Sequence, residues 1–175
     1  MSTSITHPTV VVADTETIGF PRKFKPYTDP LGYDSARLVS ISWQIFKPKL
    51  ENGNTVYSLY KSKYHIIKPN GFIIPSNVVK IHNITTAKAN KNGKEMLTVL
   101  AELHNDLKEL MEPKDANILA VAHNMNFDKH IILSEVHRHG FKELEKLLNK
   151  LPTYCTMMQS KSITKIRTER YPGFK

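Results

Sequence analysis

The chain has little of what marks secreted, membrane-spanning or zinc-binding proteins. It contains a single cysteine, Cys155, so it cannot form an internal disulfide, and no Cys/His spacing suggests a zinc site. Its apolar runs are only a few residues long, and residues 1–10 lack the basic start and apolar stretch of a secretory signal. We therefore expect an intracellular protein, in the cytoplasm or the nucleus, that is not secreted and does not insert into a membrane.

Length and charge narrow the possibilities further. At 175 residues and 40% hydrophobic, the chain is long enough for one domain with a real core. The formal net charge is +9, and residues 129–175 contribute +6 of it, with 10 basic against 4 acidic groups. Such a basic flank attracts polyanions such as nucleic acid, although a solvated basic face without a ligand explains the same excess.

The first half of the chain predicts strands. Residues 10–13 form a short apolar run that is typical of a strand covered on both faces. Residues 20–35 contain three prolines and the basic sequence RKFK, which predicts a loop. Two strand-like stretches follow at residues 36–46 and 55–67, separated by an Asn-Gly turn signal. We expect these three strands to form an antiparallel meander.

The second half predicts helices alternating with strands. A helical stripe of apolar residues ends at Pro113, and a second buried strand is predicted at residues 117–122. Next come a helix that ends at Gly140, a helix over residues 141–151 and a short strand at residues 153–157. A strand, helix, strand order implies parallel neighbours. The sequence thus predicts an α/β fold, a mixed sheet of about five strands flanked by helices.

Two acids stand at the end of the first predicted strand. Asp14 and Glu16 are two residues apart, so on a strand they point to the same side with their backbones about 6.5–7 Å apart. Like charges this close repel unless a cation or protons intervene, and oxygen ligands suit Mg²⁺ or Mn²⁺. The alternative is that the strand ends at Ala13 and both acids are solvated turn residues.

A third carboxylate lies on the apolar face of a predicted helix. Asp128 shares this face with Ile131, Ile132 and Val136, where an aspartate is costly to bury unless something pairs with it. If the helix packs beside the first strand, Asp128 approaches the acid pair. The alternative is a first-turn aspartate that is favoured by the helix dipole.

With these residues in place, the chain resembles a known family. Asp14-Thr15-Glu16-Thr17, followed by Gly19, resembles the first motif of the DEDD 3′-5′ exonucleases, and His123-Asn124 with Phe127-Asp128 resembles their second. Residues 81–85, Ile-His-Asn-Ile-Thr, resemble the His-Gly-Ile-Thr segment of the DnaQ-like (DEDDh) subgroup, which includes the proofreading subunit of bacterial replicative DNA polymerases. Asn83 takes the place of the glycine. The three motifs occur in the family's order over residues 8–175.

The resemblance implies a ribonuclease H-like fold and two-metal-ion hydrolysis of nucleotides from the 3′ end of a nucleic acid. It implies that Asp14, Glu16 and Asp128 are catalytic residues that bind Mg²⁺ or Mn²⁺. It also implies four residues that contact the substrate: Thr17, His82, Ile84 and Asn124. Taken by itself, His82 is more typical of a partly exposed surface histidine.

One part of the family pattern is absent. The subgroup carries a late His-x-x-x-x-Asp motif that supplies a general base and a fourth acid, but no aspartate follows Asp128 here, and the alternative Tyr-x-x-x-Asp motif is also missing. We therefore expect three of the four acids, a sheet whose C-terminal helices are missing, and feeble or no activity of the chain alone. General-base catalysis is worth about 10²–10⁴ in rate. A companion polypeptide that supplies the missing segment, or self-association, would cover the apolar surface left open.

Three functions remain open. The first is a DNA 3′-5′ exonuclease domain, with proofreading during DNA replication as one role. The second is a non-catalytic module that binds single-stranded nucleic acid, and the third is an RNA-trimming exoribonuclease of the same superfamily. In all three we expect phosphate contacts from the basic loop at residues 22–25 and from the tail, unless these residues are only solvated. The tail residues are Lys161, Lys165, Arg167 and Arg170.

Overall fold

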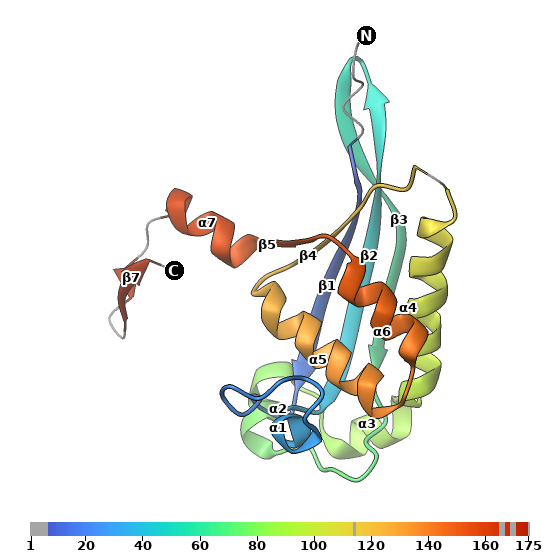
Figure 1. Ribbon diagram of the computed structural model, residues 1–175. Helices are drawn as coiled ribbons and strands as arrows, with labels where there is room; N and C mark the ends of the chain where they lie inside the picture. The colour runs from blue at the N-terminus through green and yellow to red at the C-terminus, as the bar shows by residue number, and fades with distance from the viewer. Residues whose placement is uncertain (1–6, 114, 165–166, 169–170, 175) are drawn as a thin grey trace.

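A mixed sheet forms the centre of the molecule (Figure 1). The computed structural model describes residues 7–113, 115–164, 167–168 and 171–174. The sheet has five strands in the order β3-β2-β1-β4-β5, with β1–β2 and β2–β3 antiparallel and β1–β4 and β4–β5 parallel. This confirms the predicted meander joined to parallel strands. The strands are β1 (Thr9–Thr17), β2 (Leu38–Glu51), β3 (Asn54–Ile66), β4 (Ile118–Ala122) and β5 (Thr153–Cys155).

Helices of different lengths connect and flank these strands. The longer ones are α4 (Met96–Met111), α5 (Met125–Arg138), α6 (Lys142–Lys150) and α7 (Thr156–Thr164). The shorter ones are α1 (Pro30–Tyr33), the 3₁₀ turn η1 (Asp34–Ala36), α2 (Ser76–His82) and α3 (Thr86–Asn92). A small antiparallel pair, β6 (Arg167–Thr168) and β7 (Tyr171–Phe174), follows α7. Within the described part of the chain, no helix combines the length and apolar character needed to cross a membrane.

The predicted loop at residues 20–35 contains a helical turn. Asp29 caps α1, because its carboxylate accepts a hydrogen bond from the Gly32 N–H at 3.3 Å, and Pro30 occupies the first turn. A four-residue helix with a single glycine carries no helical period in the sequence, which is why the prolines alone suggested a loop. The last predicted strand is also shorter than expected, since Thr156 already begins α7.

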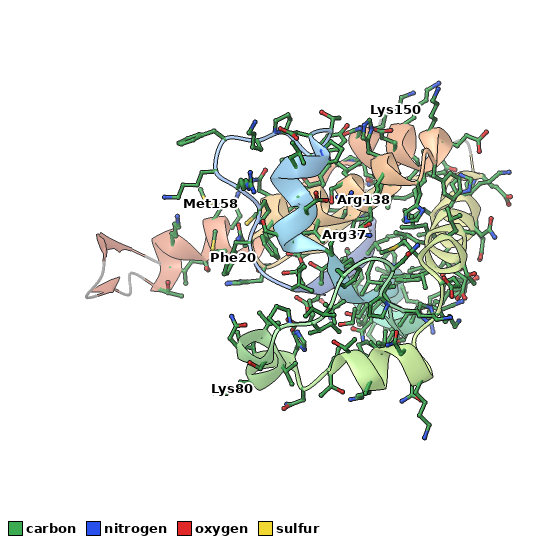
Figure 2. All side chains as sticks on the ribbon, turned by 90° about the horizontal axis from the view of Figure 1, so that it is seen from below. Phe20, Arg37, Lys80, Arg138, Lys150 and Met158 are labelled. Atoms are coloured by element: carbon green, nitrogen blue, oxygen red, sulfur yellow. The ribbon has the colours of Figure 1, made fainter. Side chains whose placement is uncertain are left out.

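Helices cover the two faces of the sheet unequally. Viewed from below, α4, α5 and α6 lie on one side of the sheet, and α2 and α3 lie on the other (Figure 2). The larger core cluster lies between the sheet and α4–α6 and includes the fully buried Trp43, Leu100 and Ile131. A smaller cluster around Val78 and Ile84 lies under α2 and α3. Beyond those two short helices, the second face bears partly exposed apolar side chains: Val10, Val12, Phe46, Leu59, Tyr64, Leu119 and Val121.

A buried ion pair fixes α5 against β2. Glu135 of α5 is 0% exposed. Its carboxylate accepts hydrogen bonds from Arg37 Nε at 2.6 Å, Arg37 Nη2 at 3.2 Å and the Leu38 N–H at 3.3 Å. Arg37 and Arg138 lie close together around this carboxylate, and Arg138 Nε is 3.7 Å from Glu135 Oε2 (Figure 2). The charge is thus buried together with the donors that it needs.

We expect Glu135→Ala to lower the free energy of unfolding by about 3–5 kcal/mol, because it leaves the Arg37 guanidinium and the Leu38 N–H buried without an acceptor. Urea denaturation followed by circular dichroism measures this change. Glu51→Ala, at the exposed end of β2, is the matched control and should stay within about 0.5 kcal/mol of the parent. Similar losses for the two variants would contradict this role.

Candidate active site

The end of β1 carries its two acids on one face of the sheet. The strand runs through both acids to Thr17, so its backbone does not end before them. Asp14 pairs with Ser42 and Glu16 with Ser40 of β2, which places both side chains on the face that α4–α6 leave open. Asp14 is exposed and Glu16 is half-buried. The acid pair is therefore held by a paired strand.

Asp128 lies under the same strand, on its covered face. The residue is 3% exposed, and its Oδ1 accepts hydrogen bonds from the Thr15 N–H at 2.9 Å and from the Thr15 hydroxyl at 2.7 Å. Thr15 stands between Asp14 and Glu16 and points to the opposite face. The helix does bring Asp128 to the end of β1, as the apolar face predicted. Its hydrogen-bond partner, however, is the threonine between the two acids.

The three carboxylates influence one another through Asp14. Burial raises the pKa of Asp128 to about 6; the hydrogen bonds from Thr15 oppose this rise, and the negative charge of Asp14 adds to it. Burial also raises the pKa of Glu16, again helped by Asp14. Their oxygens are the donors that hard divalent cations prefer. In the part of the chain that the structure describes, however, no three Asp, Glu, His or Cys side chains are grouped closely enough to hold a metal ion.

A tight turn follows the acids. The Thr17 hydroxyl donates a hydrogen bond to the Gly19 carbonyl at 2.6 Å, and the Ser35 hydroxyl donates one to the Phe20 carbonyl at 2.8 Å. A Cβ atom at Gly19 would lie only 2.8 Å from the Ser35 carbonyl oxygen, so the turn needs glycine there. As a result, the chain folds back beside the site and leaves the Phe20 ring 81% exposed.

A cavity of about 170 Å³ joins the three motifs, and we call it the inner cavity. Its walls come from the end of β1, from α2 and from the start of α5. They include Thr15, Glu16, Thr17, Gly19, Phe20, Val78, Ile81, His82 and Phe127. Two residues predicted to contact substrate, Thr17 and His82, thus meet at one place beside Glu16.

His82, one of the residues that line the cavity, has a ring nitrogen without a hydrogen-bond partner among the described residues. Its Nδ1 accepts the Ile84 N–H at 3.1 Å, so the neutral ring carries its proton on Nε2. Nε2 is buried without a hydrogen-bond partner among the described residues, and burial lowers the pKa of His82, which favours the neutral ring. Ile84 is also a predicted substrate contact, but it does not line this cavity. Its side chain is 2% exposed within the smaller core cluster, whereas Ile81 is 74% exposed and lines the cavity.

The turn between these residues explains the departure at Asn83. This residue ends α2 in the left-handed conformation, with φ of 59°. Asparagine adopts that conformation more readily than other non-glycine residues. It can therefore replace the glycine of the family segment without changing the path of the chain.

The remaining predicted residues lie further along. Asn124 precedes α5 with φ of 63°, makes no capping hydrogen bond with its side chain, and lines a second, larger cavity next to the basic loop at residues 20–25. Lys161 lies half-buried on α7. Lys165 and Arg170 lie outside the described residues, as does the side chain of Arg167. Contacts of the basic tail with phosphate therefore stay a prediction.

We expect Asp128→Asn to stabilise the metal-free protein above pH 6. The ordinary pKa of an aspartate, 3.8, is raised to about 6 here, so the folded protein binds this proton more tightly than the unfolded chain does. Stability therefore falls as pH rises from about 4 to 6, and the loss persists above that window. Asparagine keeps an acceptor for Thr15 without the charge. In urea denaturation with EDTA, the variant should exceed the parent by up to about 3 kcal/mol at pH 8, and the difference should vanish at pH 4. A variant that is less stable at pH 8 would contradict this account.

Comparisons with known proteins identify the fold. Neither a protein-family model nor a curated protein matches the chain. Among solved structures, the product-bound structure of exonuclease I superposes with a TM-score of 0.64 and 17% identity, covering 94% of this chain and 33% of that chain. Escherichia coli exonuclease I in complex with a dA16 oligonucleotide superposes with a TM-score of 0.64 and 15% identity, covering 97% of this chain and 34% of that chain. The chain thus spans about one third of the length of these neighbours. It shares with them the ribonuclease H-like α/β fold that the resemblance predicted.

Proposed function

We propose that this chain is a metal-dependent 3′-5′ exonuclease domain that acts on DNA, with Asp14, Glu16 and Asp128 as its catalytic carboxylates. The observation that carries the proposal is that Asp14 and Glu16 stand on one face at the end of β1, with Glu16 in the wall of the inner cavity, while Asp128 is hydrogen-bonded from the other face to Thr15 between them. A 3′-terminal nucleotide that occupies this cavity would place its phosphate next to the acids. The exonuclease I fold supports this assignment.

The acids suit Mg²⁺ or Mn²⁺ by their chemistry. Burial raises the pKa of both Glu16 and Asp128, the negative charge of Asp14 adds to the rise, and a divalent cation would offset that repulsion. Such ions, when bound, supply a hydroxide nucleophile and offset charge on the phosphate. The chain's own residues bind and orient the end of the strand: His82 Nε2–H donates to it, and Thr17 shapes the wall around it. Since the described residues bring no complete group of metal ligands together, we expect slow turnover from the chain alone.

The alternative is a module that binds single strands without cleaving them. The lack of a complete metal group within the described residues favours it, and so does the basic, aromatic loop beside the site. Cleavage at saturating enzyme separates the two functions. Competition between DNA and RNA oligonucleotides of one sequence separates the DNA exonuclease from an RNA-trimming enzyme.

We expect the purified chain, in molar excess and with Mn²⁺, to shorten a 5′-labelled single-stranded DNA one nucleotide at a time from its 3′ end. Asp14→Asn should lower this rate at least about tenfold, because it removes the carboxylate whose charge acts on both other acids. Denaturing gels measure the rate. Asp115→Asn, an exposed acid away from the site, is the matched control. Equal rates for Asp14→Asn and the parent would refute the proposal, and binding without any cleavage would favour the non-catalytic module.

We expect His82→Ala to weaken binding of a single-stranded oligonucleotide about 3- to 10-fold, since one hydrogen bond contributes roughly 0.5–1.5 kcal/mol. Fluorescence anisotropy without metal measures the affinity. A 3′-phosphorylated oligonucleotide carries an extra phosphate at the end that is proposed to occupy the cavity, so the substitution should change its affinity by a different factor. His7→Ala, an exposed histidine just before β1, should bind as the parent does. An unchanged affinity for His82→Ala would remove this residue from the site.

A further inference from the structure

A second cavity, of about 530 Å³, shares the Phe20 and Phe127 rings with the inner cavity, and we call it the outer cavity. These two rings line both cavities and pack against each other with centroids 5.8 Å apart. The outer cavity is otherwise bounded by the loop at residues 21–25, by Tyr33 and by the start of α5. The two cavities therefore adjoin at this pair of aromatic rings.

The loop holds one aromatic ring fully in solvent. Phe24 is 100% exposed, and its backbone adopts φ of 62°, a conformation that is uncommon for a bulky residue. The loop around it is anchored. The Arg22 N–H donates to the Gly32 carbonyl at 2.9 Å, and Lys25 pairs with Asp29 at 3.0 Å. The fold thus keeps an apolar ring exposed on a strained backbone, a combination that packing does not explain.

The charge around the outer cavity has one sign. Arg22, Lys23 and Lys25 line it together with the amides of Asn124 and Asn126, and none of its described lining residues is acidic. Lys25 is paired with Asp29, but Arg22 and Lys23 are exposed and have no acidic partner among the described residues. A ligand here must therefore tolerate positive charge and offer a flat apolar surface. Single-stranded nucleic acid provides both, through its phosphates and its bases.

We propose that the outer cavity binds the nucleotides just upstream of the 3′-terminal one, with a base stacked on Phe24 and phosphates beside Arg22 and Lys23. The inference rests on the proposed function, because it places the strand end in the inner cavity. A strand that enters the inner cavity from this side passes over the Phe20 and Phe127 rings. The site is specific for single strands, since a duplex does not offer unstacked bases, and it does not select sequence.

The test is binding of fluorescein-labelled (dT)₁₂ to the full chain in EDTA. Phe24→Gly should weaken the affinity about 5- to 100-fold, as expected for loss of one stacked base. Glycine adopts positive φ freely, so this variant relieves the backbone and should fold as the parent does by circular dichroism. Phe24→Trp should bind within about threefold of the parent, because it restores a stacking surface. Leu50→Gly, another exposed apolar residue but at the far end of β2, controls for loss of apolar surface.

Charge and ligand length supply further readouts. The double change Arg22→Gln with Lys23→Gln should reduce the slope of log affinity against log salt by about 1.4, since each phosphate contact on a single strand contributes about 0.7. Lys49→Gln with Lys150→Gln, both exposed elsewhere, should leave the slope unchanged. On this proposal thymidine 5′-monophosphate would occupy the inner cavity alone, so Phe24→Gly should not alter its binding.

The outcomes distinguish this inference from the proposed function. If Phe24→Gly binds (dT)₁₂ as tightly as the parent while the chain still cleaves DNA with Mn²⁺, the outer cavity is not a strand site and the nuclease proposal stands. If the chain never cleaves but Phe24→Gly loses affinity, the strand site stands and the nuclease proposal fails. Equal binding of blunt duplex and single strand, or a loss that follows the Leu50 control, also overturns the inference.

Discussion

Helix α5 can occupy only one position on the sheet, because two of its buried side chains are carboxylates. Asp128 and Glu135 lie about two turns apart on one face, and each accepts a hydrogen bond from a sheet N–H, of Thr15 and of Leu38 respectively. A buried carboxylate without donors is very costly, so both contacts must form together. Sliding the helix by one turn would break both. The start of α5, and with it the Phe127 ring and the Asn124 cap, is thereby set at the end of β1.

The alternation of β1 then divides the first motif between two faces. Asp14 and Glu16 point to the open face, whereas Thr15 turns toward α5 and satisfies Asp128 through its N–H and its hydroxyl. The threonine between the acids is therefore the residue that ties the second motif to the first. It also sets the electrostatics, because Asp128 is held near Asp14 without being paired to a base, and its pKa rises for that reason as well as from burial.

The sequence predicts those parts of the fold in which a single period runs long enough. The five strands, their meander and crossover, and α4 to α6 follow from runs of apolar residues at spacings of two or of three and four. Helices α2 and α3 do not, since each is short and α3 buries only Ala89. The site shows the same limit. That Asp128 comes near the acid pair follows from its helix face, but one of its partners is a backbone N–H, which every residue has, and no pattern in the sequence singles out the Thr15 hydroxyl as the other. That His82 and Ile81 rather than Ile84 line the cavity depends on the left-handed turn at Asn83, and one sequence does not reveal its φ.

The two cavities differ in the charge of the residues that line them. Glu16 lines the inner cavity, and Asp14 stands two residues away on the same face of β1, so without a cation these acids oppose the approach of a phosphate. The outer cavity is lined by basic residues, which attract a phosphate. A strand would therefore bind in the outer cavity without a cation, and a cation that offsets the charge of the acids would draw the phosphate of its terminal nucleotide toward them. Binding and hydrolysis then have different requirements, since stacking and basic charge hold the strand, whereas hydrolysis needs a cation at the acids. Phe20 and Phe127 lie where the two cavities adjoin. These apolar rings carry no charge, so on this proposal the strand crosses them from the basic cavity to the acidic one.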